Sequence, residues 1–200
     1  MDEVGEKFPM KKIAISLAAL ALAASAQAQS NSPGSNAAHN YGLLSLGQGH
    51  LNVDCTGVQT CDRNAFGGKA MFGHAFGNGF AVEGGYTNFG KFRASQGTVG
   101  LSGRPEALSL SGAYTANLSP DWGLVGRLGV ARVRTKVNAE VGALTGSSSE
   151  SKTQPIAGLA VNYALTPSTR VELGVDATRA QIQGERQNVR MVSLGARMAF

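Results

Sequence analysis

Six charged residues in this sequence lie inside runs of otherwise small or apolar residues. Three are basic and three are acidic, so their formal charges cancel: Lys69, Glu83, Arg127, Glu172, Asp176 and Arg197. Charged groups that leave water are stable only when opposite charges and hydrogen-bond partners surround them. The pattern therefore predicts a buried network of salt bridges. Static packing is its favoured role, and gating of a narrow ion pathway by the same charges is the alternative.

Residue types that commonly catalyse reactions are scarce and poorly spaced. The chain has three histidines, and none has a serine or carboxylate partner at a spacing that would assemble a catalytic triad. His50 and Asp54 would act together only if both point to one side of the same strand. No glycine-rich loop lies between a strand and a helix to hold a phosphate group. The sequence therefore predicts no catalytic residue, no cofactor and no metal site.

A buried charge network requires secondary-structure elements with one face directed to the interior and the other to the outside. From Tyr41 onward, apolar residues recur at every second position, which is the period of a β-strand. Eight such runs are bounded by turn residues: Tyr41–Val53, Ala65–Phe76, Phe80–Gly90, Leu108–Leu118, Trp122–Val137, Lys152–Leu165, Val171–Thr178 and Val189–Phe200. We therefore predict an all-β chain with eight antiparallel strands.

The N-terminal segment has the pattern of an export signal. Lys11 and Lys12 precede an apolar run at Ile13–Ala24, and Ala26-Gln27-Ala28 is a small-x-small cleavage motif. The run is shorter than the roughly 18 apolar residues of a transmembrane helix. We expect residues 1–28 to be a cleaved signal peptide, with residues 1–9 an extension ahead of the true start at Met10. Residues 29–40, rich in serine and asparagine, are expected to be a disordered leader.

Cys55 and Cys61 are the two cysteines of the chain. In an oxidising compartment outside the cytoplasm, two cysteines this close in sequence are expected to form a disulfide. Two free thiols are a weaker alternative. A metal site is weaker still, because no histidine lies nearby in a usable pattern.

Short turns and long connections alternate between the predicted strands. The short turns are Gly77–Gly79, Ser119–Asp121 and Thr166–Thr169, whereas Lys91–Glu106 and Asn138–Ser151 are long polar segments. Outer-membrane barrels have this sidedness, with short periplasmic turns and long external loops. A soluble β-sandwich also has alternating strands, but the export signal, the even strand number and the terminal Phe200 favour a barrel. We predict an eight-stranded, up-and-down transmembrane β-barrel at residues 41–200.

Four motifs occur in an order typical of one family: AVEGGYTNFGK (Ala81–Lys91), NLSPDWGLVGRLG (Asn117–Gly129), ALTPSTRVELG (Ala164–Gly174) and VSLGARMAF (Val192–Phe200). Together they resemble the small eight-stranded outer-membrane barrels that include the OmpA transmembrane domain, OmpX-like proteins and opacity-type surface proteins. The resemblance covers about Tyr41–Phe200 and implies the outer membrane of a Gram-negative bacterium. With the terminal Phe200 as an insertion signal, it also implies insertion by the barrel-assembly machinery.

Five basic residues lie where the outward faces of three predicted strands continue toward the cell exterior: Arg132, Arg134, Lys136, Arg179 and Arg190. Lipopolysaccharide presents phosphates at that height, and guanidinium groups bind phosphate through charge-assisted hydrogen bonds. Lipopolysaccharide contact is therefore one hypothesis. An equally weighted alternative is that the strands extend past the bilayer and these charges are solvated. A bulge in the strand that carries Arg132 would reverse its outward register.

The predicted role is envelope integrity and surface interaction in contact with outer-membrane lipid. Bulk transport is not expected, because side chains fill the interior of an eight-stranded barrel. The loop with Lys91, Arg93 and Arg104 is a candidate site for a host or matrix ligand, although an ordinary solvated loop is favoured. Nucleic-acid binding is not expected of an exported barrel, despite the net charge of +5. A lipid-modifying enzyme remains a second alternative after the gated pore.

Overall fold

The computed structural model describes residues 37–52, 55, 59–97, 99–141, 144–182 and 185–200. These residues form ten strands: β1 (His39–Leu51), β2 (Thr60–Asp62), β3 (Asn64–Ala75), β4 (Phe80–Asn88), β5 (Phe92–Gln96), β6 (Val99–Asn117), β7 (Trp122–Val141), β8 (Leu144–Ala164), β9 (Thr169–Ile182) and β10 (Glu185–Ala199). Within these ranges, no helix has the length and apolar character needed to cross a membrane.

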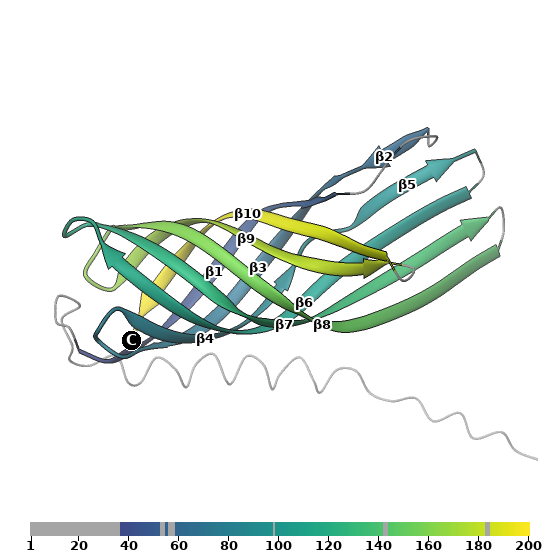
Figure 1. Ribbon diagram of the computed structural model, residues 1–200. Helices are drawn as coiled ribbons and strands as arrows, with labels where there is room; N and C mark the ends of the chain where they lie inside the picture. The colour runs from purple at the N-terminus through teal and green to yellow at the C-terminus, as the bar shows by residue number, and fades with distance from the viewer. Residues whose placement is uncertain (1–36, 53–54, 56–58, 98, 142–143, 183–184) are drawn as a thin grey trace, which may run out of the picture. The chain divides into compact units, whose positions relative to one another are not determined.

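Eight of the strands close into an antiparallel barrel (Figure 1). Each neighbouring pair in the ring β1–β3–β4–β6–β7–β8–β9–β10 is antiparallel, and β10 returns to pair with β1. The prediction of an eight-stranded, up-and-down barrel is therefore confirmed. The strand β1 begins at His39, inside the segment that the sequence predicted as a disordered leader.

The barrel wall has the two faces that the alternating sequence predicts. In β6, Ala107 and Ser111 are buried in the interior, whereas Leu108 and Leu110 on the outer face are 66% and 60% exposed. Large apolar side chains on an outer surface are stable when lipid tails surround them instead of water. The outer face of the strands therefore has the character of a lipid-facing surface.

One end of the barrel, here the turn end, has three short turns that follow β3, β6 and β8. In the first of these turns Gly77 and Gly79 have φ values of 82° and 88°, which explains the choice of glycine there. Two aromatic pairs lie on the outer face at this end. The rings of Phe80 and Tyr114 are 4.8 Å apart, and those of Trp122 and Tyr163 are 4.9 Å apart. This arrangement is that of an interfacial aromatic girdle.

The opposite end, here the loop end, differs from the prediction. The segments Lys91–Glu106 and Asn138–Ser151 were predicted as loops, but most of their residues are paired strands that extend the barrel wall (Figure 1). The strands β7 and β8 pair without interruption from Trp122↔Tyr163 to Val141↔Leu144. Beyond Phe92, most residues on both faces of this extension are polar or small, so no regular apolar alternation marks it as a strand in the sequence.

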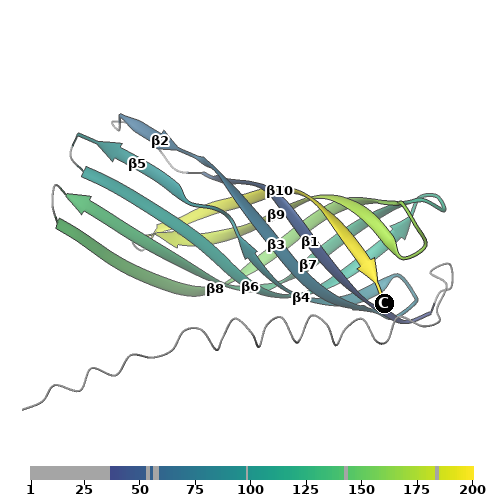
Figure 2. The same ribbon diagram turned by 180° about the vertical axis from the view of Figure 1, so that it is seen from behind.

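A break between β4 and β5 interrupts the strand that pairs with β6 on the side away from β7 (Figure 2). The two strands pair in succession with β6, and Phe89-Gly90-Lys91 interrupts them. Gly90 has a φ of 95°, which a residue with a side chain rarely adopts. The break lies beside Phe89, whose side chain is buried in the barrel.

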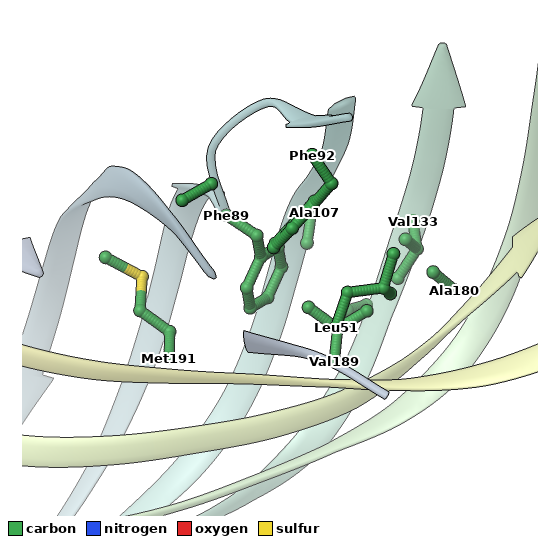
Figure 3. Close-up of a cluster of buried hydrophobic side chains, with 10 residues drawn as sticks. Leu51, Phe89, Phe92, Ala107, Val133, Ala180, Val189 and Met191 are labelled. Carbon is green, nitrogen blue, oxygen red and sulfur yellow. The ribbon is translucent and has the colours of Figure 1, made fainter. Parts of the chain in front are cut away.

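Two apolar clusters occupy the interior. One lies near the turn end and includes Tyr41, Ala81 and Val125. The larger one lies toward the loop end and consists of Leu51, Ala65, Phe89, Phe92, Ala107, Ala131, Val133, Ala180, Val189 and Met191 (Figure 3).

Candidate functional site

Four of the six interior charges form one cluster near the turn end. The Arg127 guanidinium lies 2.6 Å from Glu83 Oε2 and 2.9 Å from Glu172 Oε1. Arg197 completes the ring, with Nη2 3.0 Å from Glu83 Oε1 and Nε 3.5 Å from Glu172 Oε2. Each carboxylate is therefore shared by two guanidinium groups, and no side chain of the cluster is more than 11% exposed. The formal charges of this four-charge cluster sum to zero.

Tyr41 is a member of this cluster that sequence analysis missed. Its hydroxyl donates a 2.6 Å hydrogen bond to Glu83 Oε1, and the Arg197 guanidinium stacks 4.0 Å from the centre of its ring. The ring lies against Gly73 of β3, where a Cβ atom would overlap it. The contact of Tyr41 with Gly73 depends on the register of β1 and β3, which apolar alternation in the sequence does not define.

The other two charges form a separate pair farther from the turn end. Lys69 Nζ lies 2.5 Å from Asp176 Oδ2, and both side chains are almost fully buried. Asp176 has room because residue 158 is glycine: a Cβ atom there would lie 2.5 Å from Asp176 Oδ1. The structure therefore brings all six predicted charges into contact with a charge of opposite sign, in two neutral groups.

Little free space remains between Arg127 and the pair of Lys69 and Asp176. The cavity lined by Lys69, Asp176, Arg127 and neighbouring serines has a volume of about 10 Å³. A cavity of that size holds about one water molecule. Arg127 Nη1 is buried without a hydrogen-bond partner among the described residues, so it is available to donate to such a water. A hydrated ion would have to displace these side chains to pass.

The larger apolar cluster fills the interior on the loop-end side of the charges (Figure 3). The side chains of Phe89 and Phe92 are 0% and 4% exposed, and they face Val189 and Met191 of β10 across the barrel. The sequence did not reveal this layer, because Phe89 ends a predicted strand and Phe92 lies in a predicted loop. The interior is thus closed by charged groups toward one end and by apolar groups toward the other.

The five predicted basic residues lie on the outer face, as the unbroken register of β7 requires. Arg132, Arg134 and Lys136 of β7 are exposed, as are Arg179 of β9 and Arg190 of β10. We call these five residues the basic belt. The described part of β7 contains no bulge that would reverse the side-chain direction. The belt has two parts, because β8 separates the three residues of β7 from the other two.

Only one belt residue has a carboxylate partner among the described residues. Lys136 Nζ lies 3.4 Å from Glu106 Oε2, in a pair whose lysine is half exposed. An exposed pair of this kind is worth about 1 kcal/mol or less. The four arginines of the belt are therefore available to bind anionic groups.

The remaining predicted residues lie at the ends of the barrel. Cys55 and Cys61 form the predicted disulfide, and Cys61 lies in β2. Lys91 and Arg93 line a shallow cavity of about 240 Å³ at the loop end, together with Asp62 and Glu140. Phe200 follows β10 and is 42% exposed.

The histidines have ordinary polar contacts. His50 Nδ1 lies 2.8 Å from Asn64 Oδ1, and His74 Nδ1 lies 2.8 Å from Asn40 Oδ1. Asp54, the proposed partner of His50, lies outside the described residues. Within the described ranges, no group of three or more His, Cys, Asp or Glu residues is arranged to bind a metal ion.

Comparison with solved structures places the fold among small outer-membrane barrels. Neisserial surface protein A is 15% identical and has a TM-score of 0.57, covering 82% of this chain and 99% of its own. The outer membrane protein OprG of Pseudomonas aeruginosa is 12% identical, with a TM-score of 0.54 and coverage of 85% and 99%. Ail, the attachment invasion locus protein of Yersinia pestis, is 18% identical, with a TM-score of 0.53 and coverage of 81% and 99%. Its structure contains the heparin analogue sucrose octasulfate.

At the level of sequence, no curated protein gives a significant match. The family model described as "Outer membrane protein beta-barrel domain" does match, and it spans residues 14–200. That range contains every strand of the barrel and all eleven residues of the charge network and the basic belt. The chain therefore belongs to the family of outer membrane protein β-barrel domains.

Proposed function

We propose that this protein is a closed barrel that contributes to envelope integrity and contacts lipopolysaccharide through its basic belt. The observation that carries the proposal is the continuous outward face of β7. On that face the lipid-facing Leu124, Leu128 and Val130 are followed directly by Arg132 and the next two basic residues.

The chemistry of the belt supports this assignment. Alternate residues of a strand are about 7 Å apart, so the charges begin one step beyond the last apolar side chain. At that boundary the phosphates of lipopolysaccharide meet the barrel, and arginine binds phosphate through two parallel hydrogen bonds. On the far side of β8, Arg190 of β10 lies opposite Ala177, and Arg179 is the next outward residue of β9. These two arginines would extend the contact around the barrel.

Replacement of Arg132, Arg134 and Lys136 by alanine tests the proposal. We expect the purified triple variant to retain several-fold less lipopolysaccharide per barrel than the unaltered protein. A control replaces Arg63 and Lys152, which are exposed but lie outside both the belt and the loop that carries Lys91, and should retain the full amount. Equal lipopolysaccharide in the two variants would mean that the belt is merely solvated.

A surface ligand is a second part of the proposal. Lys91, Arg93 and Arg104 project at the loop end, and such a group favours a sulfated or otherwise anionic host or matrix polymer. The sulfated ligand in the Ail structure is consistent with this chemistry on a similar fold. Binding to immobilised heparin should fall in a triple alanine variant of these residues, and undiminished binding would remove this part of the proposal.

The gated pore is the less favoured function. Conductance that changes when Glu83 or Arg127 is replaced would support a gated pore. The cavity of about 10 Å³ beside Lys69, Asp176 and Arg127 instead favours static packing of the charges. For insertion, we propose that Phe200 forms part of the signal that the barrel-assembly machinery recognises.

A further inference from the structure

A cavity of about 490 Å³ opens at the turn end of the barrel interior. We call it the vestibule. Its lining includes His39, Tyr41, Asn162, Arg170 and Arg197, and among the described residues that line it there is no aspartate or glutamate. This volume is within the range of small-molecule sites, and the absence of carboxylates from the lining favours an anionic ligand.

Arg170 gives the vestibule a positive charge that the neighbouring cluster does not cancel. No carboxylate among the described residues lies within ion-pair distance of its guanidinium. Glu83 and Glu172, the acidic residues of the adjacent four-charge cluster, are each already shared by Arg127 and Arg197. The cluster together with Arg170 therefore has a formal charge of +1.

Asn162 adds a directional donor to this charge. Its side chain is 1% exposed, and its Oδ1 accepts a 3.0 Å hydrogen bond from Arg170 Nη1. Because Arg170 can only donate, this contact defines which side of the amide is the oxygen. The amide Nδ2 is then left without a hydrogen-bond partner among the described residues. A buried donor without a partner is costly and rare in folded proteins, and a bound acceptor would satisfy it.

We infer that the vestibule binds a small anion with a carboxylate or phosphate group. Arg170 supplies the counter-charge, Asn162 Nδ2 donates to an oxygen of the anion, and His39 and Arg197 lie at the same wall. The site is distinct from the basic belt, which lies on the outer surface of the barrel. Because the vestibule lies within the ring of strands at the end with periplasmic turns, the ligand is a periplasmic solute and not a membrane lipid.

The test uses inorganic phosphate and citrate as probes of the refolded protein in lipid nanodiscs. Each probe is titrated while the side-chain ¹⁵N resonances of Asn162 and Arg170 are recorded. We expect saturable shifts of both resonances, with a Kd of about 1 mM or below for at least one probe. The variant Asn162→Asp places a carboxylate beside Arg170 without a change in size, and it should weaken binding at least tenfold. Arg170→Gln should do the same, whereas Lys152→Gln, at an exposed position outside the vestibule, should have no effect.

Three results would overturn the inference. The first is the absence of saturable shifts with either probe up to about 20 mM. The second is equal affinity of the unaltered protein, Asn162→Asp and Arg170→Gln, which would locate the bound anion elsewhere. The third is a shift that follows the anionic lipid content of the nanodisc and not the added solute. A gel-mobility change on boiling shows that each variant is folded, so loss of binding cannot be confused with loss of the barrel.

Discussion

Arg127 is the residue on which the interior depends most directly, because it contacts both carboxylates of the four-charge cluster. Arg127→Gln leaves Glu83 and Glu172 buried with less compensation. Loss of one partner from a buried ion pair typically costs about 3–5 kcal/mol, and we expect a loss of that size in the free energy of unfolding in detergent. The exposed Arg132→Gln is the matched control and should change it by about 0.5 kcal/mol or less. Equal stability of the two variants would contradict a structural network.

Lys69 and Asp176 allow a sharper test, because their pair has no other charged partner among the described residues. The single variants Lys69→Met and Asp176→Leu each leave one buried charge alone and should each destabilise the barrel. In the double variant no unpaired charge remains, so it should be more stable than either single variant, with a coupling energy of about 1–3 kcal/mol. Urea denaturation of all four proteins measures this coupling. Additive losses would show that the two residues do not interact.

At the scale of elements, the strands β7 and β8 extend beyond the membrane-facing wall, and β7 also pairs there with β6, as far as Val99↔Val141. We expect the barrel to remain folded when residues 138–147 are replaced by an Asn-Gly turn. The described side chains in this segment are exposed or half-buried, so their removal costs little interior packing. The variant should keep the gel-mobility change on boiling. Its free energy of unfolding should remain within about 1 kcal/mol of that of the unaltered protein. Failure to fold would mean that residues 138–147 are part of the folding core.

The sequence predicts the barrel strands and their two faces well, because each membrane-spanning run has lipid on one side and packed side chains on the other. That constraint produces the alternation of Leu108 and Leu110 with small inward residues. The six charges predicted for the interior lie on the inward face, each beside a charge of opposite sign. It fails where both faces are in contact with water, as in β5 beyond Phe92 and in the outer parts of β7 and β8. It also gives no information on contacts that require the register, such as Tyr41 with Gly73 or Arg170 with Asn162.

At the scale of the whole molecule, the interior is arranged in successive layers. The vestibule is followed by the four-charge cluster, the pair of Lys69 and Asp176, and the apolar layer that contains Phe89. As a member of its family, the protein is located in the bacterial outer membrane. We propose that a barrel with these layers gives a path there neither to hydrated ions, which the apolar layer would exclude, nor to apolar solutes, which the charges would exclude.

Single-channel recording of the refolded protein in a planar bilayer tests this central claim most directly. Folding is first verified by the change of gel mobility on boiling. A closed interior predicts a bilayer that remains silent, both for the unaltered protein and for Glu83→Gln. Discrete openings of the unaltered protein that Glu83→Gln abolishes or alters would contradict it, because the charged cluster would then be a gate and not a plug.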